Sequence, residues 1–112
     1  MSVDWWSKLH GLFEESNNLA KEAGIFLELH PELKNENEIY SDSDTWSPYS
    51  LFLADIMCLG NAIHHSYFYL DEEDLTDELW EQNYNDYSKD LNESKEEFQK
   101  FKGSLIKSSH KQ

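Results

Sequence analysis

Mostly apolar residues recur at helical spacing in two long segments of the chain. In about residues 3–23 and 76–102 the intervals alternate between four and three residues, which is one face of an amphipathic helix. The first segment carries Trp5, Leu9, Leu12, Ser16, Leu19 and Ala23, and the second carries Trp80, Tyr84, Tyr87, Leu91, Ser94, Phe98, Phe101 and Leu105. Gly24 and Gly103 suit left-handed helix stops, so we expect two long helices and a frayed tail at 104–112.

A third helix is predicted over 48–70, where Ser47 is a suitable N-cap and Pro48 suits the first helical position. This segment is apolar nearly all round, which is typical of a central, buried helix. Cys58 lies within it and is therefore expected to be buried as well. Pro31 indicates one or two short helical turns within 25–34, and residues 35–46 form a polar, acidic loop. The prediction for 1–112 is an all-α, single-domain bundle of three long helices plus one or two short helical turns.

The main functional clue in the sequence is its negative charge. The 112 residues carry a net charge of −14, and residues 35–88 hold 13 of the 23 acidic side chains without one Lys or Arg. Seven carboxylates crowd the start of the helix predicted over 76–102 and the residues just before it: Asp71, Glu72, Glu73, Asp74, Asp77, Glu78 and Glu81. The helix dipole favours two or three acids there, but pairs spaced four apart repel each other. A further acidic stripe, Asp86, Asp90, Glu93 and Glu97, borders the apolar face. These features predict a docking face for a basic protein, with solubility as the alternative reading.

Aromatic residues beside the acidic loops are candidate contacts. Trp46 follows Asp42 and Asp44, and Tyr69 precedes the cluster at 71–81. Neither aromatic belongs to a periodic stripe, and Tyr and Trp are frequent anchors in protein interfaces. We therefore expect Asp42, Asp44, Trp46 and Tyr69 to lie near this cluster and to contribute specificity to the partner contact. The alternative is that Trp46 packs back onto the bundle as a lid.

Several function classes are disfavoured. Nucleic acid and anionic membranes would be repelled by the charge, and no catalytic, phosphate-binding or cofactor motif is present, so we expect no enzyme and no cofactor. His64 and His65 point about 100° apart on a helix and lack the spacing of a bundle metal site, which leaves their role open. One cysteine and no cationic-then-apolar leader favour a reducing, cytoplasmic location.

In size, acidity, cysteine economy and aromatic content the chain resembles the bacterial immunity proteins that neutralise nuclease toxins of colicin and contact-dependent growth-inhibition systems. The resemblance implies a monomer that binds its cognate toxin in a 1:1 complex and covers the cationic active site. No site residue is carried over from these families. Two alternatives stay open: a DNA mimic that blocks DNA-binding proteins, and a structural or adaptor bundle that dimerises through an apolar face left uncovered.

Overall fold

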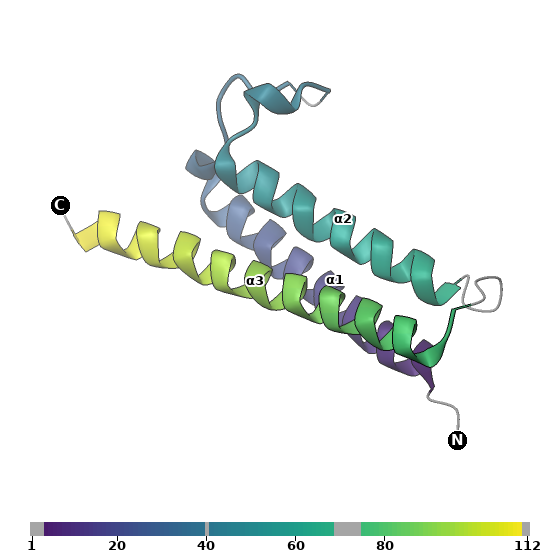
Figure 1. Cartoon of the computed structure of the whole chain (residues 1–112). Coiled ribbons are helices and arrows are strands. Elements are labelled where there is room, and N and C mark those ends of the chain that lie inside the picture. Colours follow the sequence, from purple (N-terminus) through teal and green to yellow (C-terminus); the bar gives the residue numbers. More distant parts are fainter. Residues whose placement is uncertain (1–3, 40, 69–74, 111–112) are drawn as a thin grey trace.

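The computed structural model describes residues 4–39, 41–68 and 75–110, with 106–110 described by backbone alone. The long helices are α1 (Trp5–Leu29), α2 (Pro48–Phe68) and α3 (Asp77–His110), with two short 3-10 turns, η1 (Pro31–Leu33) and η2 (Ser43–Thr45). The described residues contain no strand, only an isolated bridge between Ile39 and Asp42. The predicted all-α bundle is confirmed. Its three helices run up, down and up, with α3 lying across the α1–α2 pair (Figure 1), and its extents are 59 × 31 × 18 Å.

The helix starts follow the sequence signals. The Asp4 carboxylate caps α1 by accepting hydrogen bonds from the Ser7 backbone N–H at 3.1 Å and from the Ser7 hydroxyl at 2.7 Å. These bonds lower the pKa of Asp4 below its ordinary value. Ser47 caps α2 as predicted, because its Oγ accepts from the Ser50 backbone N–H at 3.1 Å.

Two predicted helix stops are wrong. Helix α1 continues through Gly24 to Leu29, and α3 continues through Gly103 to His110, so residues 104–110 are helical rather than frayed. Neither glycine adopts the positive φ of a left-handed stop. A glycine inside a helix costs only about 1 kcal/mol relative to alanine, which does not end a helix when the following residues are good helix formers. The predicted break at Pro31 is confirmed as η1.

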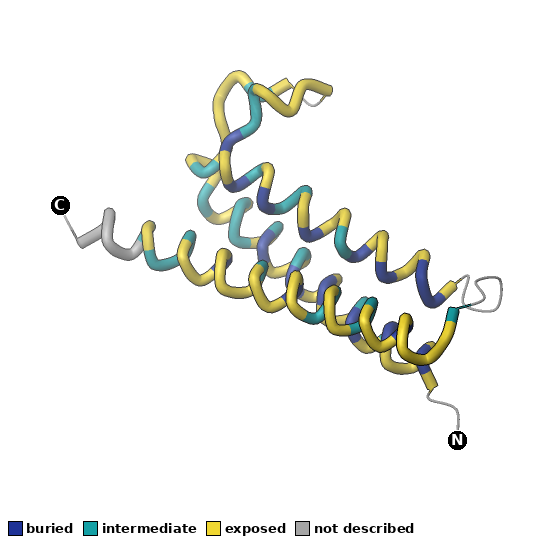
Figure 2. Tube along the Cα trace, in the orientation of Figure 1, coloured by how far each residue is buried: buried dark blue, intermediate teal, exposed yellow. Residues whose placement is uncertain are grey.

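The core lies where the helical stripes predict it. All six residues of the α1 stripe are buried, and the α3 stripe is buried or half-buried throughout, with Trp80, Leu91 and Phe98 the most enclosed. Figure 2 shows the buried positions recurring along the inner sides of the helices. Across the core, the Tyr49 hydroxyl of α2 donates to the Ala23 carbonyl of α1 at 2.5 Å. Burial raises the pKa of Tyr49 to about 12.

Helix α2 is not the buried central helix that its composition predicts. Only the side that faces α1 and α3 is enclosed, while Leu51, Met57 and Phe68 remain 42%, 58% and 65% exposed. Cys58 is also exposed, contrary to expectation. It lies two residues after the buried Ile56, and two residues turn the helix by about 200° to its far side. A bundle of three helices cannot enclose any one of them, so an all-apolar helix necessarily shows part of its surface.

Candidate protein-binding surfaces

Only part of the predicted acidic cluster lies within the residues that the structure describes. Tyr69 and four of its acids, Asp71, Glu72, Glu73 and Asp74, lie outside the described residues. The remaining three, Asp77, Glu78 and Glu81, are exposed on the first turns of α3. Asp77 also has a structural task, because its Oδ1 accepts a hydrogen bond from Trp5 Nε1 at 3.0 Å and ties the start of α3 to the start of α1.

The acidic loop does not lie beside this cluster. Asp42 and Asp44 are exposed in η2, before the start of α2, whereas Asp77 lies at the start of α3. Helix α2 has 21 residues and so separates the two regions by about 30 Å. They occupy opposite ends of the molecule (Figure 1). The expectation that Asp42, Asp44 and Trp46 stand near the cluster is therefore wrong, because a straight helix carries the chain away between them.

The loop from Asn35 to Ser47 is held by one carboxylate that sequence reasoning did not single out. Glu38 Oε1 accepts hydrogen bonds from the backbone N–H groups of Ser47 at 2.7 Å and Asn35 at 3.1 Å, and from the Ser50 hydroxyl at 2.9 Å. Burial raises the pKa of Glu38, but these donors outweigh it and lower the pKa to about 2. Glu38 is nine residues before Ser47, a separation that matches neither helical nor strand periodicity. Its role in holding the loop is therefore visible only in the folded structure.

Acid should therefore loosen this loop. Because the pKa of Glu38 is depressed to about 2, its stabilising effect is fully present above the ordinary pKa near 4.5 and is lost as the pH falls toward about 2. We expect amide exchange at Asn35 and Ser47 to accelerate over this interval, as measured by NMR. Glu38→Gln should accelerate the same amides already at neutral pH. Glu36→Gln, a change at an exposed neighbour with no such bonds, is the matched control and should leave them protected.

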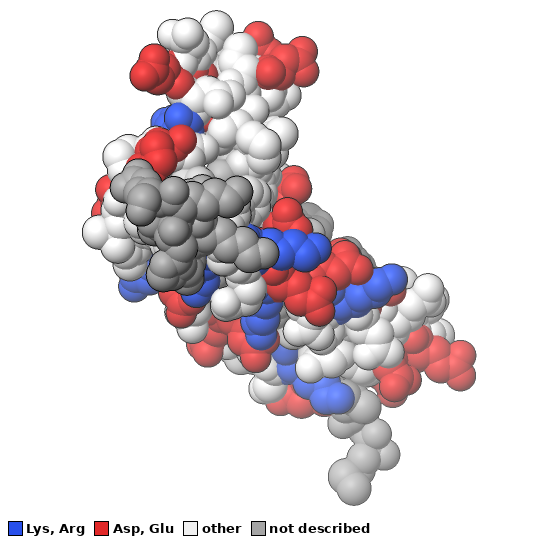
Figure 3. Space-filling model, turned by 90° about the vertical axis from the view of Figure 1, so that its left-hand side faces the viewer, with Lys and Arg blue, Asp and Glu red and all other residues white. Residues whose placement is uncertain are grey.

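Trp46 is half-buried and shares a hollow with residues of the bundle. Its indole Nε1 donates to the Ile39 carbonyl at 2.9 Å, and its ring lines a cavity of about 190 Å³ with Leu27 and Leu53. This placement fits the lid alternative better than that of a free contact residue. The outer flanks of the loop carry carboxylates on both sides (Figure 3), while lysines and carboxylates are mixed over the lower part of that view.

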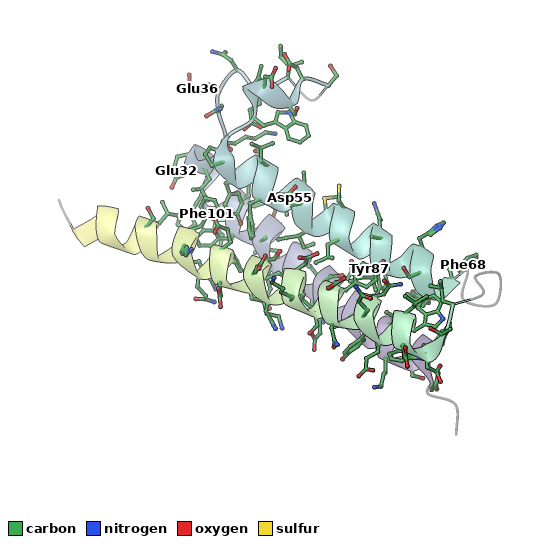
Figure 4. The ribbon with its side chains drawn as sticks, in the orientation of Figure 1. Glu32, Glu36, Asp55, Phe68, Tyr87 and Phe101 are labelled. Atoms are coloured by element: carbon green, nitrogen blue, oxygen red, sulfur yellow. The ribbon has the colours of Figure 1, made fainter. Side chains whose placement is uncertain are left out.

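An acidic hollow lies between α2 and α3. This α2/α3 groove has a volume of about 530 Å³ and is lined by Asp55, Cys58, Leu59 and Ala62 from α2 and by Tyr87, Asp90, Glu93, Ser94 and Glu97 from α3. Three members of the predicted acidic stripe thus face a carboxylate from another helix. Asp55 and Tyr87 project from the two helices in Figure 4. Sequence reasoning missed Asp55 as a site residue, although it is the sole Asp, Glu or Lys in α2.

The groove carboxylates are poorly neutralised. Among the described residues, no lysine or histidine lies within 4 Å of the carboxylates of Asp55, Asp90 or Glu93, and Glu97 has a single long ion pair with Lys100 at 3.9 Å. The floor is apolar, and the Tyr87 hydroxyl bonds to Ser66 Oγ at 2.7 Å beneath it. An apolar floor with unpaired carboxylates at its rim suits the aliphatic stems and charged heads of Lys or Arg side chains.

The two adjacent histidines separate as predicted. Both histidines are exposed, and the His64 ring also packs against Phe13 and Tyr67, with centroids at 5.2 and 5.1 Å, and stacks on Phe68 at 5.6 Å. Within the described residues, no group of three or more His, Cys, Asp or Glu side chains is arranged to hold a metal ion. Nor does any described helix combine the length and apolar character that crossing a bilayer requires.

Comparison with known proteins gives no relative: no family model, no curated protein and no solved structure matches the chain.

Proposed function

We propose that the chain is a small inhibitory binding protein that docks the cationic surface of a basic protein into the α2/α3 groove. The observation that carries the proposal is the set Asp55, Asp90 and Glu93, which line the groove beside apolar residues and have no lysine or histidine within 4 Å among the described residues. A side chain left charged and unpaired on the surface gains when an opposite charge is brought to it in a partly dehydrated interface.

The partner expected is a toxin of the nuclease class. An enzyme that holds nucleic acid needs a cationic groove for the phosphates, and a protein of net charge −14 is attracted to such a groove over long range. Electrostatic steering raises association rates toward 10⁸–10⁹ M⁻¹ s⁻¹ at low salt. In this proposal Glu78, Glu81 and the rest of the cluster at 71–81 supply long-range attraction, and the groove supplies the contact. The chain acts in the cytoplasm as an immunity protein and performs no catalysis.

Capture of the partner tests the proposal. The purified chain, immobilised, is exposed to an extract of cells that encode it and washed at low and then at high salt. We expect one basic protein to be retained at a stoichiometric level, to be toxic when expressed alone, and to lose its nuclease activity when the chain is added.

Two results would count against it. Retention of many DNA-binding proteins that all elute at moderate salt would favour a DNA mimic instead, because a mimic recognises phosphate-binding surfaces in general. Retention of a single protein that the chain binds without changing its activity would leave a binding module but remove the inhibitory function.

A further inference from the structure

A second surface, on the side of α1 and α2 away from α3, is apolar and already ordered. We define it as the α1/α2 face, formed by Trp6, His10 and Asn17 of α1 and by Met57, His64 and Phe68 of α2. Trp6, Met57 and Phe68 are 51%, 58% and 65% exposed, and contiguous exposed apolar side chains are more informative than single ones. Beside them is a shallow hollow of about 160 Å³ that Phe13, Asn17, Met57 and Gly60 help to line.

The aromatic rings of this face are fixed by one another. Trp6 stacks on His10 with centroids 4.8 Å apart and planes within 5°. Both rings meet the edge of the buried Tyr67, at 5.7 and 5.4 Å, and Tyr67 in turn contacts His64. Rings held in this way lose little conformational freedom when something covers them, so binding here carries a small entropic cost.

The α1/α2 face differs from the other helix junctions in charge. The α2/α3 groove is lined by four carboxylates, and the groove between α1 and α3 by Glu15, Glu22 and Glu96 with Lys95. The hollow on the α1/α2 face has no charged lining residue. The nearest charges on α1 are Glu14, whose carboxylate lies 3.4 Å from His10 Nδ1, and Lys21, one turn after Asn17.

We propose that this face is the contact between two copies of the chain, related by a two-fold axis. Two molecules of charge −14 repel each other, and they can approach most closely at a surface whose described hollow has no charged lining residue. A two-fold contact places the same patch on both sides, so exposed apolar rings beside an uncharged hollow can face their own copy. The contact also covers the flank of α2 beside α1, which includes the exposed Met57, and so buries more of a helix whose composition is that of a buried one.

The expected dimer is weak and dissociates on dilution. Half-exposed aromatic side chains present roughly 100 Å² each, so two copies of the face would bury on the order of 1,000 Å², at the low end for specific interfaces. The arrangement replaces the monomer expected from the sequence. It leaves the α2/α3 groove open on another side of α2, so each copy can still take a partner and the inference does not depend on the proposed function.

Molar mass measured over a dilution series tests this inference, by size-exclusion chromatography with light scattering and no partner present. At high concentration the wild type should have twice the chain mass of 13.3 kDa and should fall to 13.3 kDa on dilution. Met57→Lys should lose the dimer, because each copy then carries a cation into the contact. This variant reduces the net negative charge, so overall repulsion cannot explain the loss.

Leu79→Lys is the matched control, since Leu79 is 45% exposed and lies on α3. It should dimerise like the wild type, and circular dichroism should find both variants as helical as the wild type. A wild type that stays at 13.3 kDa at every concentration would overturn the proposal. So would a dimer that survives Met57→Lys, whatever Leu79→Lys does.

Discussion

Replacing two groove carboxylates, Asp90→Asn together with Glu93→Gln, should accelerate dissociation from the basic partner by at least about 100-fold. The reason is that truncating one member of a desolvated charge pair costs about 2–5 kcal/mol, mostly in the dissociation rate. Association at low salt should slow by roughly 10-fold as well, because the attractive field weakens. Surface plasmon resonance at several salt concentrations separates the two rates, with the captured partner as analyte. The fold should not suffer, since both residues are exposed and belong to a self-repelling stripe.

The matched control removes the same charge from the start of α3. Glu78→Gln with Glu81→Gln should slow association and flatten its salt dependence, while dissociation stays within about two-fold of the wild type. Both residues are exposed, and no described cation lies within 4 Å of either carboxylate. If this pair instead accelerates dissociation and the groove pair does not, the contact lies at the start of α3, where the sequence analysis placed it.

The exposed acids at the start of α3 and the carboxylates of the α2/α3 groove are expected to act at different stages of binding. A cluster on an exposed helix end attracts a cation from a distance but holds it poorly, because water screens charges on an open surface. Carboxylates at the rim of an apolar groove are desolvated when the partner arrives, and their attraction then strengthens. The steering and the holding of a basic partner can therefore be assigned to separate residues, which is why the two rates are expected to respond separately.

The helical stripes were predictable because they depend on a local period. Trp5 to Ala23 and Trp80 to Leu105 keep one face toward the core whichever way the helices pack. The ends of those helices were not predictable from Gly24 and Gly103, since a glycine ends a helix only where the chain must turn. The chain turns after Leu29 instead, where His30 and Pro31 follow.

The candidate site was harder to predict from the sequence than the fold, because its residues come from two different helices. Asp90, Glu93 and Glu97 were recognised as a stripe on one helix, but their partner Asp55 is 35 residues away from Asp90 along the chain, and no periodicity links them. The exposed side of α2 was misjudged for a related reason. The apolar composition of α2 predicts that Met57 and Cys58 are buried. Whether they are covered depends on how many helices pack around α2, which the sequence of α2 alone does not give.

Trp80→Ala should destabilise the protein by about 3–5 kcal/mol, the usual cost of removing a buried tryptophan side chain. Trp80 is 3% exposed, and only two other α3 side chains among the described residues are as fully enclosed, Leu91 and Phe98. Since a domain of this size has a total stability of roughly 5–15 kcal/mol, the loss removes much of what holds α3 to the other helices. Urea denaturation followed by circular dichroism, at one low protein concentration, measures the shift.

Leu79→Ala is the control, because Leu79 is the adjacent residue on the same turn and is 45% exposed. It should cost about 1 kcal/mol or less. Equal effects of the two changes would mean that Trp80 is not an anchor of α3. A fall in the urea m-value of Trp80→Ala, beyond the shift of its midpoint, would indicate that α3 has separated from α1 and α2 before the main transition. The α2/α3 groove would be lost with it, since the groove exists only while Asp90 and Glu93 face Asp55.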